Sequence, residues 1–119
     1  MKKYFAGMIA IVVAVASVAF TNVKAPRVDY DFFYDNASYT EGAVTTLGNW
    51  KSNISPSCNG TNTKACKIKV NESYVNTGVS PMVLRTSGSF VLDIETAGAA
   101  DSKYVVTTTG VSAITNRSN

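Results

Sequence analysis

The stretch Cys66-Lys67-Ile68-Lys69-Val70 alternates apolar and cationic side chains at every position. Successive side chains of a β-strand point to opposite faces of the sheet. This period of two predicts a strand in which Cys66, Ile68 and Val70 pack on a core while both lysines point to solvent. It is the clearest strand signal in the chain, and the fold class depends on it.

Further strands are predicted on both sides of this segment, because other short runs are rich in β-branched or aromatic residues. These runs are residues 28–34, 81–84, 90–95 and 104–109. The Ser87-Gly88 junction between the second and third runs favours a hairpin. No segment after residue 21 shows helical periodicity. The patterns predict an all-β fold, a small sandwich or open barrel of about four to six strands after an N-terminal signal helix.

The segments between the predicted strands are polar and rich in turn-forming residues, which predicts loops. Residues 36–48 are expected to contain at most one short strand, and residues 52–64 to form a surface loop. Residues 97–102 are expected to be a linker of small residues. The polar tail from Gly110 to Asn119 is expected to fray.

The N-terminus has the order of an export signal. Lys2 and Lys3 precede an apolar run without charge that extends to Phe20. The small residues of Ser17-Val18-Ala19 predict cleavage before Phe20, and Ala14-Val15-Ala16 is a second possible site. Residues 1–19 are therefore predicted to be a signal peptide, and residues 20–119 a single small β-rich domain.

The alternative to a signal peptide is an uncleaved membrane anchor, because the run of 17 residues from Tyr4 to Phe20 reaches the lower end of the length that spans a bilayer. In both cases the positive charge before the run keeps the N-terminus in the cytoplasm and places the rest of the chain on the far side. The predicted location is the periplasm, the cell surface or the medium. Membrane contact is expected only through an uncleaved N-terminal segment.

The charge of the exported part excludes one class of partner. The full chain has 11 Lys and Arg against 8 Asp and Glu. Two of these lysines lie in the predicted signal, so the exported part has nine cationic side chains against eight acidic ones, a net charge of +1. Nucleic-acid binding requires a clustered excess of Lys and Arg, so no nucleic-acid partner is expected.

Cys58 and Cys66 are the only cysteines, and an Asn-Gly turn lies between them. In an oxidising compartment an isolated pair at this spacing predicts a disulfide that closes the loop. Two free thiols are the main alternative. A zinc site would need further ligands, and a redox-active pair would have two intervening residues rather than seven.

Four lysines form a cationic group around the cysteine loop, with no acidic residue between Gly42 and Val70. Such a group is a candidate contact for an anionic surface, such as lipopolysaccharide or a phosphate-bearing glycan. The competing interpretation is a guard against aggregation at a sheet edge, because lysine commonly has this role. The four residues are Lys51, Lys64, Lys67 and Lys69.

No pattern in the chain predicts a catalytic, cofactor-binding or metal site. The chain has no histidine, which removes the usual general base near neutral pH and the commonest metal ligand. Asp29, Asp31 and Asp35 begin like a calcium-binding loop, but Tyr34 stands where the loop requires glycine and Thr40 where it requires an acid. We therefore expect a protein without cofactor that is not an enzyme.

The layout resembles an uncharacterised family of short exported bacterial proteins, a domain of unknown function. The resemblance rests on the Met-Lys-Lys start, on Trp50 a few residues before the two-cysteine loop, and on the alternating strand that begins at Cys66. It covers about the first 75 residues. It implies bacterial export and assigns no activity.

The sequence thus favours a non-enzymatic exported protein that acts by surface contact at the cell envelope or outside the cell. The expected partner is a protein or a glycan of the envelope. The alternative is a small cationic toxin or antimicrobial factor, suggested by the disulfide loop and its lysines and weakened by the low net charge.

Overall fold

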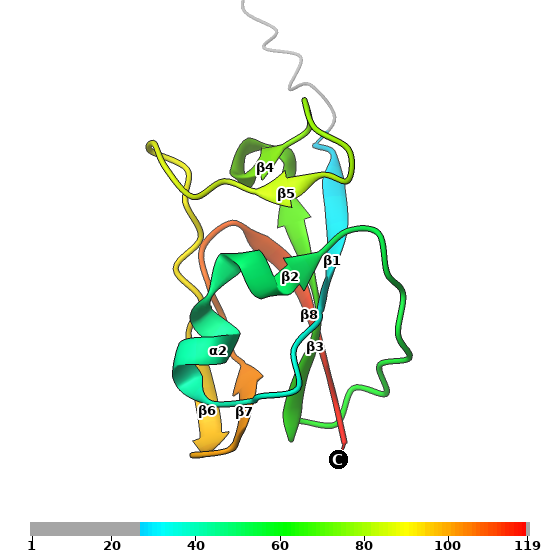
Figure 1. Cartoon of the computed structure of the whole chain (residues 1–119), viewed down its shortest axis with the longest axis vertical. Helices are drawn as coiled ribbons and strands as arrows, with labels where there is room; N and C mark the ends of the chain where they lie inside the picture. Colours follow the sequence, from blue (N-terminus) through cyan, green and yellow to red (C-terminus); the bar gives the residue numbers. More distant parts are fainter. Residues whose placement is uncertain (1–26, 119) are drawn as a thin grey trace, which may run out of the picture.

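A four-stranded antiparallel sheet forms one layer of the protein (Figure 1). The computed structural model describes residues 27–118, so the predicted signal segment and its cleavage sites lie outside the described residues. The strand order in this sheet is β2-β1-β3-β8, and each pair is antiparallel. Its strands are β1 (Asp29–Tyr34), β2 (Trp50–Lys51), β3 (Lys64–Asn71) and β8 (Val111–Arg117).

The alternating segment 66–70 lies in β3, as predicted. Ile68 and Val70 are fully buried and Cys66 is 1 % exposed, while Lys67 and Lys69 remain partly exposed on the other face. Ile68 stands opposite Phe32 of β1 and Ile114 of β8. The apolar face of β3 therefore lies at the middle of the sheet and of the core.

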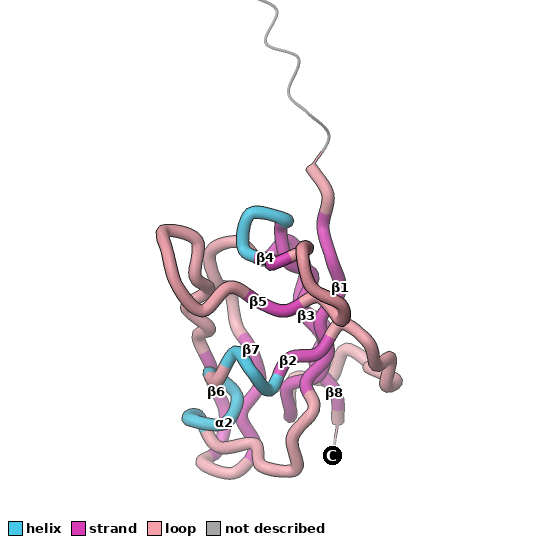
Figure 2. The backbone as a smooth tube through the Cα atoms, turned by 45° about the horizontal axis from the view of Figure 1, so that its top comes forward, coloured by secondary structure: helices cyan, strands magenta, loops and turns pink. Residues whose placement is uncertain are grey.

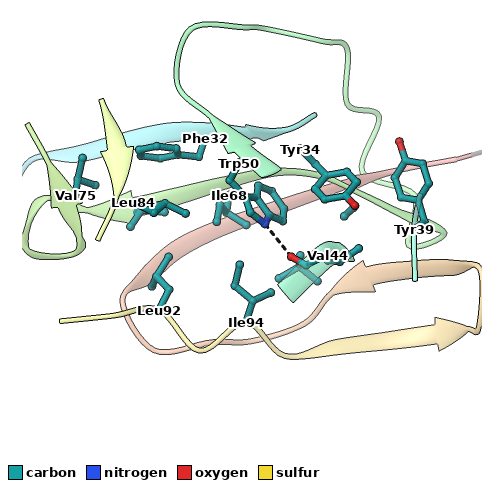
Figure 3. Packing of buried hydrophobic residues seen from close by; sticks show 13 residues of the cluster. Phe32, Tyr34, Tyr39, Val44, Trp50, Ile68, Val75, Leu84, Leu92 and Ile94 are labelled. Carbon is teal, nitrogen blue, oxygen red and sulfur yellow. Dashed lines mark hydrogen bonds between the residues drawn. The ribbon is translucent and has the colours of Figure 1, made fainter. Parts of the chain in front are cut away.

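A second layer covers the apolar face of this sheet. It consists of α2 (Glu41–Thr45), the hairpin of β6 (Thr96–Ala99) and β7 (Ser102–Val105), and the segment that precedes β6. Figure 3 shows Phe32, Trp50 and Ile68 on the sheet side of the core, with Val44, Leu92 and Ile94 facing them. The indole nitrogen of Trp50 donates a 2.9 Å hydrogen bond to the carbonyl oxygen of Val44, which ties α2 to the sheet.

A short two-stranded sheet, β4 (Val75–Asn76) with β5 (Val83–Leu84), closes one end of the core through the buried Val75 and Leu84. Two 3₁₀ turns, η1 (Leu47–Asn49) and η2 (Glu72–Tyr74), lead into β2 and β4. The described chain thus has eight strands in three open sheets, and β2, β4 and β5 are only two residues long. The predicted small all-β domain is confirmed.

The prediction of a loop without helix for residues 36–48 is wrong, because α2 and η1 lie there. Val44 of α2 is fully buried under the sheet. A helix of five residues spans little more than one turn, which is too short to produce a recognisable period. Burial of Val44 and its carbonyl bond to Trp50 stabilise this turn in the folded protein.

The predicted hairpin around Ser87-Gly88 does not form. β5 pairs with β4, and residues 85–95 form no ladder. Leu92 and Ile94 are buried and the residues between and after them are exposed, so the alternation was informative about burial. The alternation could not show which other segment would pair with residues 90–95, because many extended segments share the same alternating pattern.

The hairpin occurs instead at residues 97–102, where a linker was expected. β6 and β7 are joined by the two-residue turn Ala100-Asp101. Gly98 has a positive φ of 104°, and a Cβ there would lie 2.5 Å from the Ser102 carbonyl oxygen. A residue with a side chain would not fit this close approach, which explains the glycine in the strand.

The expectation of a frayed tail is also wrong. Residues 111–117 form β8, which pairs with β3 along most of its length. Its Asn116 finds hydrogen-bond partners inside the fold and is only 3 % exposed. Polarity alone therefore misleads at this position, since a hydrogen-bonded amide can be buried at little cost.

Candidate functional site

The predicted disulfide between Cys58 and Cys66 is present, with the two Cα atoms 5.8 Å apart. It holds the long loop between β2 and β3 against the beginning of β3. Gly60 in the same loop donates a 2.9 Å backbone hydrogen bond to Asn116 of β8. The disulfide and this bond together fix the predicted surface loop, which Figure 2 shows without regular structure.

Lys67 and Lys69 lie on a central strand, because β3 has β1 on one side and β8 on the other. Lysines that guard a sheet stand on its edge strands, where backbone groups are unpaired. The guard interpretation is therefore wrong for these two residues. It remains available only for Lys51, which lies on the edge strand β2.

The sheet brings two of the four predicted lysines together around an aromatic ring. Phe33 of β1 is the direct cross-strand partner of Lys51 on β2 and of Lys67 on β3. Directly opposed residues lie on the same face of a sheet, about 5 Å apart. The ammonium group of Lys67 stands 6.0 Å from the centre of the Phe33 ring. We call Lys51, Phe33 and Lys67 the cationic row.

The other two lysines do not join the cationic row. Lys69 makes the single ion pair found between residues 27 and 118, with its Nζ 3.8 Å from Oδ1 of Asp31. Both side chains are about two-fifths exposed, so the pair is weak but reduces the local positive charge. Lys64 lies over the ring of Tyr39, its Nζ 4.8 Å from the ring centre. The predicted four-lysine group is thus split by the fold.

Tyr39, beside Lys64, has a second cationic neighbour. The guanidinium of Arg117 lies 5.5 Å from the Tyr39 ring centre and donates a hydrogen bond to its hydroxyl group. Tyr39 also packs against Tyr34, with ring centres 5.2 Å apart. Because Tyr39 is only 8 % exposed, we assign this cluster to the core rather than to a binding surface.

The fold changes the acidity of the Tyr34 phenol. Burial raises the pKa of its phenol to about 12, and the neighbouring Tyr39 adds to the rise. Its hydroxyl group donates a hydrogen bond to the carbonyl oxygen of Ser38. At neutral pH the group is protonated, which fits a structural role.

The three aspartates that were compared with a calcium loop do not converge on one point. Asp29 and Asp31 lie on the outer face of β1, and Asp31 pairs with Lys69. Asp35 follows β1 and bonds through its backbone nitrogen to the carbonyl of Asn49. Over residues 27–118, no three His, Cys, Asp or Glu side chains gather closely enough to hold a metal ion.

One site was missed by sequence reasoning altogether. An open groove of about 470 Å³ lies where the first residues of β1 meet the end of β3 and the start of β8. Its walls come from four separate parts of the chain, namely residues 27–29, 71–74, 90 and 110–112. No local pattern could have indicated it, because the lining residues are adjacent only in the folded protein.

Comparison with known proteins adds no relative. No family model matches the chain, and neither the curated proteins nor the solved structures contain a match. The resemblance to a family of exported bacterial proteins therefore stays a prediction. Between residues 27 and 118 no helix has the length and apolar character needed to cross a membrane.

Proposed function

We infer that the protein is a non-enzymatic exported protein that acts by contact with an anionic polymer of the cell envelope or the medium. The observation that carries this proposal is the cationic row on the outer face of the four-stranded sheet. In it two lysines from different strands flank one partly exposed aromatic ring. Phosphate groups of a glycan or of lipopolysaccharide are the anions that such a surface would meet.

The geometry of the cationic row suits a repeating anionic chain. Lys51 and Lys67 lie two strand spacings apart, about 10 Å at their Cα atoms. Both extend from a rigid sheet, so little conformational entropy of the backbone is lost when they bind. Phe33 between them offers an apolar surface to the carbon skeleton of a sugar or an acyl chain.

The position of Lys67 also argues for contact rather than for protection of the fold. It stands on a central strand, where an edge guard has no purpose. Its side chain has no acidic partner within the described residues, in contrast to Lys69. The charge of Lys67 is therefore available to an external anion.

The experiment measures binding of the purified protein to a phosphate-bearing polysaccharide and to neutral dextran at low and at physiological salt. The double variant Lys51→Gln/Lys67→Gln should lose at least tenfold in affinity for the anionic polymer and keep its melting temperature. Binding should weaken as salt rises, because the charges are exposed.

The matched control is Arg85→Gln/Lys103→Gln, which removes the same charge outside the cationic row. This control should retain most of the affinity. If both double variants lose affinity equally, overall charge rather than the cationic row is responsible, and the proposed site is wrong. If the wild type binds dextran as well as the anionic polymer, the proposal fails.

The toxin alternative makes a different prediction with the same material. A toxin should reduce the viability of a susceptible bacterial strain when it is added in purified form. A contact protein should leave growth unchanged and sediment with the envelope fraction. Killing that depends on Lys51 and Lys67 would replace the proposal by the alternative.

A further inference from the structure

The groove at the beginning of β1 has one aromatic wall and one polar wall. Tyr74 and Phe90 form the aromatic wall, with ring centres 5.6 Å apart and planes at 88°. Phe90 is 50 % exposed, although it sits in a segment whose Leu92 and Ile94 are buried. A large apolar side chain held half in solvent beside a groove is available to a ligand.

The Tyr74 ring packs directly on the backbone of Gly110. Gly110 has a positive φ of 86°, and a Cβ at this position would lie 2.4 Å from a carbon of the Tyr74 ring. Only glycine allows the ring to lie so close to the chain. The close packing on Gly110 therefore places the Tyr74 ring of the aromatic wall without any contact from a ligand.

The polar wall is built by a cross-strand pair. Asp29 of β1 and Asn71 of β3 are direct partners, so their side chains lie next to each other on one face. The Ser112 hydroxyl donates a 2.8 Å hydrogen bond to Oδ2 of Asp29, which orients the carboxylate. Oδ1 of Asn71 accepts a 3.0 Å bond from the Ser73 backbone, which directs the amide NH₂ away from that bond.

The polar wall thus presents a carboxylate acceptor and an amide donor side by side. Arg27 also lines the groove, so its charge is opposed by that of Asp29 and the site has little net charge. A ligand with a strong charge of either sign would gain little electrostatic attraction in this groove. A ligand with several uncharged groups that both donate and accept hydrogen bonds would use both walls.

A pyranose ring has these properties. Its axial C–H groups form an apolar face that packs on an aromatic side chain, and its hydroxyl groups both donate and accept. The volume of about 470 Å³ falls within the usual range for small-ligand sites and can hold one or two sugar units. A purely apolar ligand would remove water from the charged Asp29 carboxylate, and the single bond from Ser112 does not replace that hydration, which is costly.

We propose that this groove binds one or two units of a neutral saccharide, packed on Tyr74 and Phe90 and hydrogen-bonded to Asp29 and Asn71. The site is separate from the cationic row, since Asp29 and Asn71 lie four residues along their strands from Phe33 and Lys67. Figures 1 and 2 show that β1 begins near the β4–β5 sheet, at the end of the molecule opposite the β6–β7 turn.

The test uses the purified protein and a panel of neutral disaccharides: maltose, cellobiose, lactose and chitobiose. Binding is followed by changes in amide NMR chemical shifts during titration. At least one disaccharide should bind and shift the amides of Asn71, Ser73 and Gly110. Phe90→Ala should weaken that binding at least tenfold, and Phe90→Trp should restore it.

Asp29→Asn should weaken binding at least fivefold, because a neutral amide accepts hydrogen bonds less strongly than a carboxylate. The matched controls are Val79→Ala and Asp93→Asn, which remove an exposed apolar group and an exposed carboxylate outside the groove. They should bind as the wild type does. All variants should keep the wild-type melting temperature, which separates loss of binding from loss of fold.

The proposal is overturned if no disaccharide of the panel binds, if the shifts map elsewhere, or if Phe90→Ala binds normally. Binding of extended peptides instead of sugars at the same amides would also overturn it. The variant Lys51→Gln/Lys67→Gln should still bind the disaccharide, and Phe90→Ala should still bind the anionic polymer. These crossed measurements distinguish a failure of the saccharide proposal for the groove from a failure of the anionic-polymer proposal for the cationic row.

Discussion

The side-chain amide of Asn116 forms hydrogen bonds with both the backbone N–H and the backbone C=O of Val105. Its Oδ1 accepts a 3.1 Å hydrogen bond from the Val105 nitrogen, and its Nδ2 donates a 3.0 Å bond to the Val105 carbonyl oxygen. Asn116 thereby imitates a neighbouring strand and joins β8 of the first layer to β7 of the second. Nδ2 also reaches Oδ1 of Asn62, which connects the cysteine loop to the same point.

We predict that Asn116→Ala destabilises the protein by about 2–4 kcal/mol, because it leaves a buried N–H and C=O of Val105 without partners. Chemical denaturation measures the change. The control Asn53→Ala, at an exposed loop position, should change stability by no more than about 0.5 kcal/mol. Equal stability of the two variants would mean that this bond pair does not hold the layers together.

Ile68 supplies a test of the central strand. It is fully buried between Phe32 and Ile114, so Ile68→Ala should cost about 2–5 kcal/mol through lost burial and the cavity left behind. Lys67→Gln on the opposite face should cost no more than about 0.5 kcal/mol. Thermal unfolding of both variants checks the contrast, and a harmless Ile68→Ala would contradict the assignment of β3 as the centre of the core.

The disulfide should be complete in the native protein and should contribute to its stability. Alkylation before reduction should label neither Cys58 nor Cys66, whereas alkylation after denaturation and reduction should label both. Replacing both residues by alanine should lower the free energy of unfolding by roughly 2–3 kcal/mol, the value expected for a short closed loop. Labelling of the native protein without reductant would contradict the structural role.

The raised pKa of Tyr34 predicts that the protein loses stability in alkaline solution. In the unfolded chain its phenol titrates near pH 10, whereas burial raises the folded-state pKa to about 12. Above pH 10 the unfolded chain therefore binds fewer protons than the folded one, and stability falls as pH rises from about 10 to 12. The contribution of the neutral phenol is fully present below pH 10.

The measurement compares the midpoint of urea unfolding at pH 9 and pH 11.5 for the wild type and for Tyr34→Phe. Both proteins share every other titrating group, so the difference between their pH slopes isolates Tyr34. The variant should lose less stability over this interval than the wild type. Parallel slopes would show that the buried phenol does not titrate differently in the folded state.

The sequence by itself determined the local features of this protein. The period-two pattern predicted β3 and its buried face, the aromatic alternation predicted β1, and the isolated cysteines predicted the disulfide. These features depend on neighbouring residues or on a short loop, so their physical cause can be seen in a short stretch of chain. The all-β class followed from their sum.

Tertiary structure decided everything that depends on which segment lies beside which. It made β3 a central strand, which removes the edge-guard interpretation of Lys67 and places Phe33 between Lys51 and Lys67. It turned the polar tail into β8, because residues 111–117 pair with β3 and the buried Asn116 finds its partners on β7. It also assembled the groove from four distant segments. Pairing and burial arise from long-range contacts, and a pattern that many segments share cannot specify its own partner.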